Sequence, residues 1–207
     1  MATKRQTITY DVHPGVAMIQ KWQADLPAKT GRALDEWATL VRKKGFALPR
    51  DASAWLKSDY GLATMTAYSI AEYTVGKLPW EGDPKLYLQN AVEYVEAMFA
   101  GPKQWQRAIF EEVIAFARTL GRDVAVCPCK TIVPIYRNRV IAELKPATRT
   151  RLELAFVLGE VPVQGRLVRN PRAKADDRRQ HLIGLTPEAG FDSECNKWLK
   201  AAYRFDA

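Results

Sequence analysis

The sequence is short of the residues and runs that mark several large classes of protein. Its 207 residues include only three cysteines and two histidines. An odd, small number of cysteines does not make the disulfide framework of a small secreted domain. No stretch approaches the roughly 20 apolar residues of a membrane-spanning helix, and no apolar segment follows Lys4 and Arg5 near the N-terminus. We therefore expect no signal peptide, no membrane partner and a cytoplasmic location.

Sequence motifs of catalysis and of tight cofactor binding are also missing. There is no GxSxG, P-loop, Rossmann fingerprint or HExxH. Cys127 and Cys129 share one face of an expected strand, but two further zinc ligands at suitable spacing are lacking. Cys195 and His181 can be drawn as a nucleophile pair, yet Cys195 belongs to an apolar helix face. We expect no catalytic residue, no metal site and no cofactor, and we lean toward a protein that is not an enzyme.

Proline and glycine divide the chain into two parts. Two of each fall within the nine residues from Gly76 to Pro84, which is typical of a linker. We predict a small helical domain over residues 1–76, a linker over residues 77–84 and a larger domain over residues 85–207.

The first part has the spacing of short amphipathic helices. Thr30 is placed to cap a helix that carries Trp37 on its apolar face, and acidic residues early in that helix suit its dipole. Two more helices are expected from about Asp51 to Ser58 and from Thr64 to Val75. At about sixty residues, this domain has a small core and would be marginally stable alone.

The second part changes from helical to strand periodicity. An Asp-Pro start signal at residues 83–84 and a stop at Gly121 bound a helical hairpin. About five strands follow from residue 124, with a tight turn at 137–139 and a helix at the C-terminal end. Residues 169–180 lack apolar periodicity and are predicted to form an exposed basic loop. We expect an α+β fold, with the hairpin packed on one face of an antiparallel sheet.

Positive charge is concentrated in one segment of the chain. The formal net charge is +8, from 31 basic and 23 acidic residues. Residues 122–181 alone carry 13 basic and 6 acidic residues, whereas residues 1–121 carry 15 and 13. A local excess of one sign creates a field that attracts polyanions.

This excess predicts a surface that binds nucleic acid or another polyanion by neutralising phosphates and releasing counterions. The residues predicted to form it are Lys130, Arg137, Arg139, Lys145, Arg149, Arg151, Arg166, Arg169, Arg178 and Arg179, with Arg172 and Lys174 in the same run. The competing interpretation is a solvated surface in which arginines pair with nearby acids, for example Arg151 with Glu153 or Glu143.

Two other functions stay open at this point. A pocket between the helical hairpin and the sheet, lined by Trp105, Tyr136 and Trp198, would bind a small ligand or support an enzymatic activity. Alternatively, the chain is an interaction adaptor, and the N-terminal helices dock a protein partner.

Two stretches of the chain are similar to known bacterial families. The run Leu26-Pro-x-Lys-Thr-Gly-Arg-x-Leu-x-Glu-Trp37 resembles a small domain of unknown function, whose members usually carry serine or a similar cap at the position of Ala33. Residues from about 85 to 205 resemble a second domain of unknown function, often labelled a predicted transport protein. The pieces that carry this likeness are Lys130-Thr131, Tyr136-x-Arg-x-Arg139, Arg151-Leu-Glu-Leu154 and Trp198-Leu-Lys-Ala-Ala-Tyr203. The resemblance implies a cytosolic bacterial tandem with an α+β second domain, and it implies no activity and no site residues.

Overall fold

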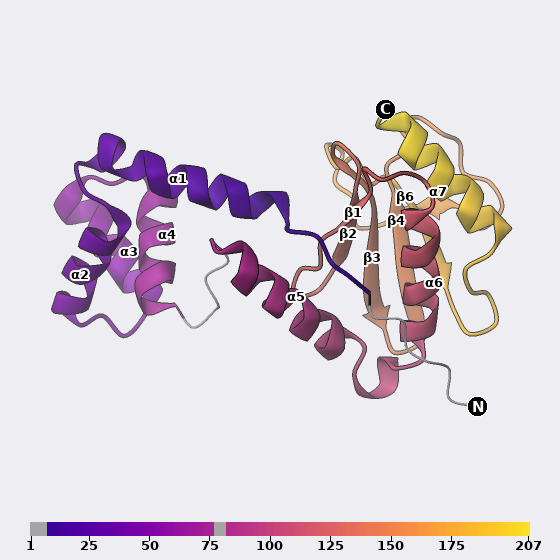
Figure 1. Cartoon of the computed structure of the whole chain (residues 1–207), viewed down its shortest axis with the longest axis horizontal. Coiled ribbons are helices and arrows are strands. Elements are labelled where there is room, and N and C mark those ends of the chain that lie inside the picture. The colour runs from indigo at the N-terminus through magenta and orange to yellow at the C-terminus, as the bar shows by residue number, and fades with distance from the viewer. Residues whose placement is uncertain (1–7, 77–81) are drawn as a thin grey trace. The chain divides into compact units, whose positions relative to one another are not determined.

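The computed structural model describes residues 8–76 and 82–207, and Figure 1 shows its helices and strands. The described helices are α1 (Pro14–Thr30), α2 (Leu34–Lys44), α3 (Pro49–Tyr60), α4 (Thr64–Val75), α5 (Pro84–Met98), the short 3-10 helix η1 (Gly101–Lys103), α6 (Gln106–Arg118) and α7 (Ser193–Phe205). The described strands are β1 (Ala125–Val126), β2 (Val133–Tyr136), β3 (Val140–Thr148), β4 (Arg151–Phe156), β5 (Val168–Arg169) and β6 (His181–Leu185). None of these helices has the length and apolar character needed to cross a membrane.

The chain divides into two compact units. One is Pro14–Tyr87, which holds α1 to α4 and the first turn of α5. The other joins the N-terminal segment, described from Ile8 to His13, to Leu88–Ala207. The predicted linker covers residues 77–84, of which residues 77–81 lie outside the described part of the chain.

The helical unit packs around the indole of Trp37. This side chain on α2 is 1% exposed, and its Nε1 donates a hydrogen bond to the Thr30 hydroxyl at 2.9 Å. The ring of Tyr60 meets the indole edge-on. The enclosed apolar side chains of the unit are Leu26, Leu34, Trp37, Val41, Ala52, Leu56, Ala67, Ile70 and Ala71. They come from all four helices, so each helix depends on its neighbours to bury its apolar face.

Thr30 is not the N-cap that the sequence suggested. It is the last residue of α1, and its hydroxyl donates to the Leu26 carbonyl at 2.8 Å. The next helix starts after Ala33, whose backbone N–H donates to the Glu36 carboxylate at 2.6 Å. The prediction was wrong because α1 continues to Thr30 and Gly31, with a φ of 76°, then turns the chain. This turn moves the start of α2 three residues along.

The second unit is an α+β fold with one sheet. Its six strands lie in the order β1-β2-β3-β4-β6-β5, and every neighbouring pair is antiparallel. In Figure 1, α6 and α7 lie over one face of the sheet. The inward faces of these two helices include Phe110, Val113, Ile114 and Ala117 from α6 and Cys195, Trp198, Leu199 and Ala202 from α7. The predicted fold class is confirmed, with six strands where the sequence indicated about five.

Alternation along β3 and β4 gives the sheet two different faces. Leu144 and Leu154 lie opposite each other in the register and are fully buried. Lys145 and Glu153 are also opposite each other, and they point to the other face because side chains alternate along a strand. Residues 170–180, between β5 and β6, contribute to the lining of a polar cavity on that face. The loop predicted from sequence as exposed and basic therefore covers charged side chains of the sheet.

The N-terminal segment 8–13 packs beside β1 of the α+β unit. The backbone N–H of Asp11 donates to the Val126 carbonyl at 2.9 Å, and the Val126 N–H donates to the Asp11 carboxylate at 2.7 Å. Arg118 on α6 pairs with the same carboxylate at 2.5 Å. The imidazole Nε2 of His13 lies 3.0 Å from the Tyr136 hydroxyl. The sequence had grouped this segment with the helical domain, since neither hydrophobic periodicity nor punctuation reports such distant contacts.

We expect the Asp11→Ala variant to loosen this N-terminal segment. The change leaves the Val126 N–H and the Arg118 guanidinium without their shared acceptor, which costs about 1 kcal/mol of unfolding free energy. Urea unfolding together with limited proteolysis of the first residues checks this expectation. Asp176→Ala is the matched control because Asp176 is exposed. Equal stability and equal cleavage in the two variants would contradict the docking of this segment.

Candidate functional site

The twelve basic residues singled out from the sequence separate into two groups. Seven lie within 4.0 Å of a carboxylate oxygen, namely Arg137, Arg139, Arg151, Arg166, Arg172, Arg178 and Arg179. Within the described part of the chain, no acidic oxygen lies that close to the other five, which are Lys130, Lys145, Arg149, Arg169 and Lys174. For the seven arginines of the first group, the structure agrees with the competing interpretation, in which arginines pair with nearby acids.

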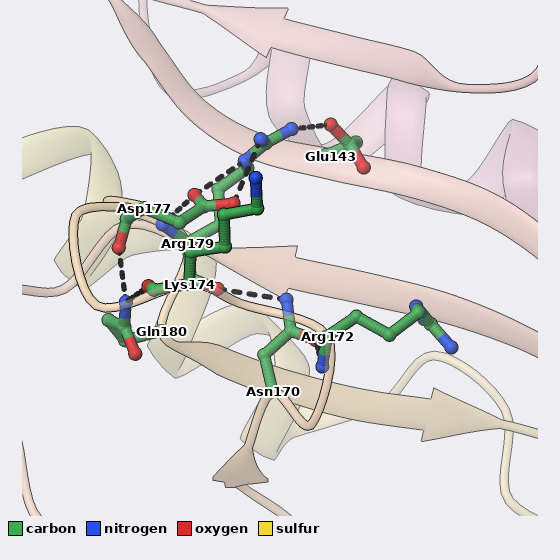
Figure 2. A network of polar contacts seen from close by, with 7 residues as sticks. All are labelled: Glu143, Asn170, Arg172, Lys174, Asp177, Arg179 and Gln180. Carbon is green, nitrogen blue, oxygen red and sulfur yellow. Dashed lines mark hydrogen bonds and ion pairs between the residues drawn. The ribbon is translucent and has the colours of Figure 1, made fainter.

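The loop between β5 and β6 is held to the sheet by paired charges, as Figure 2 shows. Arg179 forms an ion pair with Glu143 of β3, and its Nε lies 3.0 Å from the carboxylate of Asp177. Arg172 forms an ion pair with Glu153 of β4, a residue that is 1% exposed. The guanidinium groups of this loop are therefore engaged inside the domain.

The electrostatics of this network follow from burial and pairing. Burial raises the pKa of Glu143, and the neighbouring Arg179 guanidinium opposes that rise. Hydrogen bonds from Arg179 hold the pKa of Asp177 below its usual value. The polar cavity under the loop has a volume of about 180 Å³ and is lined by charges of both signs. A phosphate that took Arg172 away from Glu153 would leave a buried carboxylate without that partner, which is costly.

The turn after β2 clasps the C-terminal end of the chain. Asp206 is 3% exposed and accepts hydrogen bonds from the Arg139 backbone N–H at 2.7 Å and from the Arg139 Nε at 3.3 Å. The Arg178 guanidinium lies 3.4 Å from the same side chain. The Asn138 amide donates to the Asp206 carbonyl at 2.8 Å. Arg139 and Arg178, both predicted to bind nucleic acid, thus anchor Asp206, the residue that follows α7.

Arg137 and Arg166 also hold parts of the fold together. Arg137 pairs with Asp123 at 2.8 Å, and its guanidinium lies 4.2 Å from the centre of the Tyr203 ring. Arg166 pairs with Asp192, the N-cap of α7, at 2.6 Å and donates to backbone carbonyls before that helix. Each guanidinium satisfies several acceptors at once, which suits its fixed fork of donors.

A hollow lies where the end of α5 and η1 meet the end of β3. Its lining includes cations that form none of the ion pairs described above. We name it the basic hollow, after its four cations Lys103, Lys130, Lys145 and Arg149. Its other lining residues are Tyr94, Ala97, Met98, Ala100, Pro102, Thr131, Pro146 and Ala147. Its volume is about 650 Å³, and no acidic residue of the described part of the chain lines it.

Three hydrogen bonds from the helical hairpin fix the shape of the basic hollow. Lys103 Nζ donates to the Pro146 carbonyl at 2.6 Å, and the Gln106 side chain donates to the Thr148 carbonyl at 2.7 Å. The Trp105 indole donates to the Arg149 carbonyl at 2.8 Å. These donors secure the backbone of the turn between β3 and β4 against the start of α6.

Sequence reasoning found three of the four cations and missed Lys103. That lysine lies before the basic segment, in a short 3-10 helix in which it is the one charged residue. Only the contact of η1 with the turn after β3 brings it to the other three. No local signal in the sequence reports such a contact between residues more than 40 positions apart.

The three aromatic residues of the predicted ligand pocket have separate roles in the structure. Trp105 borders the basic hollow through its bond to Arg149. Tyr136 contacts His13, and burial raises the pKa of Tyr136 to about 12. Trp198 is 4% exposed on the inner face of α7, with Lys197 over its ring. The contacts of the three rings thus place them in different parts of the unit.

Of the three cysteines considered as zinc ligands or nucleophile, Cys127 and Cys195 are buried thiols and Cys129 is half-buried. Burial raises the pKa of Cys127 to about 12 and that of Cys195 to about 11. Both are therefore protonated at neutral pH, whereas a nucleophilic cysteine acts as its thiolate. His181 is fully buried on β6, and its Nε2 lies 2.7 Å from the Val161 carbonyl.

Comparison with protein families gives two matches in tandem. Residues 95–206, more than half of the chain, match the domain of unknown function DUF5655. The chain belongs to the DUF5655 family. Residues 18–75 match the domain of unknown function DUF4287, which confirms the predicted tandem. No curated protein and no solved structure matches the chain. The basic hollow, the clasp at Asp206 and the loop network all lie in the DUF5655 domain or at its edge.

The clasp at Asp206 generates a prediction about pH. Burial works to raise the pKa of Asp206, but hydrogen bonds from Arg139 and Arg178 outweigh it and hold the pKa below its usual value. A carboxyl with a lowered pKa in the folded state stabilises the fold above about pH 4, near its unfolded pKa, and loses that contribution as the pH falls further. We expect Asp206→Asn to lower the unfolding free energy by about 1–3 kcal/mol at pH 7.

Urea unfolding at pH 7 and at pH 3 measures this effect. The difference between Asp206→Asn and the wild type should shrink at the lower pH, where the wild-type carboxyl takes up a proton. Asp176→Asn, at an exposed position in the β5–β6 loop, serves as the control. A difference independent of pH would refute the clasp as the source of the stability.

Proposed function

We propose that the DUF5655 domain binds an anionic partner, specifically nucleic acid, through the basic hollow. The observation that carries this proposal is the gathering of Lys103, Lys130, Lys145 and Arg149 around one concavity with no acidic lining residue. We propose binding rather than catalysis, and a cytoplasmic location, where nucleic acid is accessible.

The proposal narrows the surface that the sequence indicated. Seven arginines of that surface pair with carboxylates that hold parts of the fold together, so we do not assign the phosphate contacts to them. Arg169 and Lys174 are exposed but do not line the basic hollow. The phosphate contacts are therefore assigned to the four cations of the hollow, of which Lys130 and Arg149 are the most exposed.

The physical mechanism is phosphate neutralisation with release of condensed counterions. For a single strand, the logarithm of the binding constant falls with the logarithm of salt concentration with a slope of about −0.7 for each phosphate contacted. Four contacts give a slope of about −3. Arg149 adds geometric selectivity, because a guanidinium binds two phosphate oxygens at once.

A protein partner for the DUF4287 domain is a second proposal. Met65 and Tyr68 lie one turn apart on α4 and are 70% and 50% exposed, which is high for large apolar side chains. Such a protein would bind the helical unit, whereas the basic hollow belongs to the other unit.

The proposed function predicts a charge-specific loss of nucleic-acid binding. We expect the wild-type protein to bind a labelled 20-nucleotide DNA strand about 50-fold more weakly at 200 mM than at 50 mM salt. The Lys130→Ala/Arg149→Ala double variant should show about half of the wild-type slope and a weaker affinity, because two phosphate contacts are gone. Fluorescence anisotropy measures both.

The matched control is the Arg122→Ala/Arg204→Ala double variant. It removes the same charge from two exposed positions outside the basic hollow. Its salt dependence should equal that of the wild type. If both double variants lose the same affinity, only the net charge matters, and the assignment to the basic hollow is wrong.

A further inference from the structure

The basic hollow combines two kinds of surface that a simple phosphate-binding patch does not need. Its cations come from three separate places: η1, the connection between β1 and β2, and the end of β3 with its turn. Between them lies an apolar wall formed by α5, η1 and the end of β3. A ligand that fills the hollow must therefore carry both negative charge and an apolar part.

We propose that the basic hollow holds one nucleotide unit, with the phosphate of that unit and the neighbouring phosphates of the strand at the cations and its base against the apolar wall. This inference rests on the proposed function and names the part of the nucleic acid that is recognised. The same unit occurs in a free mononucleotide and in an unpaired position of a strand, so the shared chemistry is a phosphate joined to a flat heterocycle.

The size of the basic hollow agrees with a single small ligand. Its volume of about 650 Å³ lies within the range of roughly 300–1,000 Å³ that is usual for small-molecule sites. In a double helix, stacking on the neighbouring base pairs covers the faces of each base, so a paired base could not lie against the wall. An unpaired nucleotide is therefore the form of nucleic acid that this concavity fits.

The wall offers surfaces on which a base can stack. Tyr94 on α5 is a half-buried aromatic residue of the lining, and Met98, Pro102 and Pro146 add apolar area. Aromatic side chains stabilise a bound base through stacking, with little dependence on which base is present. The wall therefore favours a nucleotide over a bare phosphate without selecting a sequence.

The four cations of the basic hollow differ in exposure and in hydrogen bonding. Lys103 is already committed to the Pro146 carbonyl, so it holds the hollow in shape while adding positive charge. Lys130 and Arg149 are exposed, and Lys145 is half-buried on the sheet. The Lys103 ammonium has two further N–H donors, so all four cations take part in the phosphate contacts of this proposal. Because hydrogen bonds already fix the turn between β3 and β4, little ordering is needed on binding.

Filling the hollow without changing its charge tests the inference. Ala97 on α5 and Ala100 after it are both exposed and both line the hollow, so Ala97→Trp and Ala100→Trp place an indole in the space for the base. Val92→Trp is the control, since Val92 is 51% exposed on the same helix and outside the lining. Circular dichroism and thermal unfolding verify that each variant folds.

The probes are the labelled 20-nucleotide strand, adenosine monophosphate and ribose 5-phosphate. We expect Ala97→Trp and Ala100→Trp to weaken strand binding about tenfold, while Val92→Trp leaves it unchanged. Adenosine monophosphate should displace the strand, and ribose 5-phosphate, which lacks the base, should do so at least tenfold less well. Binding of adenosine monophosphate without binding of the strand would assign the site to free nucleotides and would overturn the nucleic-acid proposal alone.

Two results would overturn the inference. If the three tryptophan variants bind the strand equally and with wild-type salt dependence, the base does not enter the hollow, and the proposed function stands without it. If ribose 5-phosphate competes as well as adenosine monophosphate, the site recognises phosphate alone. Absence of binding by the strand and by both small ligands at 50 mM salt would remove the proposed function and the inference together.

Discussion

Two carboxylates on the outer face of the sheet, one buried and one half-buried, impose the arrangement of the DUF5655 domain. Glu143 and Glu153 lie on neighbouring strands, and burial of their charges is costly unless cations and hydrogen bonds offset it. The cations come from Arg172 and Arg179 of the β5–β6 loop and from Arg151 on the strand itself. The loop must therefore lie against the sheet, although its sequence has no apolar periodicity to hold it there.

This constraint decides what becomes of the basic segment. Of the twelve basic residues singled out from the sequence, the seven that form ion pairs are all arginines, whereas three of the five without an acidic partner among the described residues are lysines. The division has a physical reason: a guanidinium presents a planar fork of donors that satisfies a carboxylate and several carbonyls together, and an ammonium is a strongly hydrated point charge. Net charge alone therefore overstates the surface that a polyanion can reach, and residue type indicates which charges the fold uses.

The sequence predicted what depends on local pattern. Helical periodicity, the switch to strand alternation and the turn at Arg137–Arg139 were enough for the α+β class, and the tandem followed from short motifs. Contacts between distant segments were out of reach. The docking of residues 8–13 on β1 and the approach of Lys103 to Pro146 each depend on tertiary packing. The sequence thus indicated three of the four cations of the basic hollow, but it did not indicate the hollow itself.

Lys145 shows how the structural network and the basic hollow depend on each other. It lines both the hollow and the polar cavity under the loop, directly opposite Glu153 in the register. A lysine in that position would ordinarily pair with the glutamate across the strands. Here Arg151 and Arg172 take the two carboxylate oxygens of Glu153, and no acidic oxygen of the described residues lies within ion-pair distance of Lys145.

The arginines that the sequence assigned to the anion surface therefore contribute to it indirectly. Arg151 and Arg172 form ion pairs with Glu153, the carboxylate that lies opposite Lys145, and Lys145 also lines the hollow. A like arrangement holds on the other side, where the hydrogen bond from Trp105 fixes the Arg149 backbone and leaves its guanidinium exposed. The positive charge of the hollow is thus maintained by ion pairs and hydrogen bonds outside it, which is why neither the segment's net charge nor its local motifs define the site by themselves.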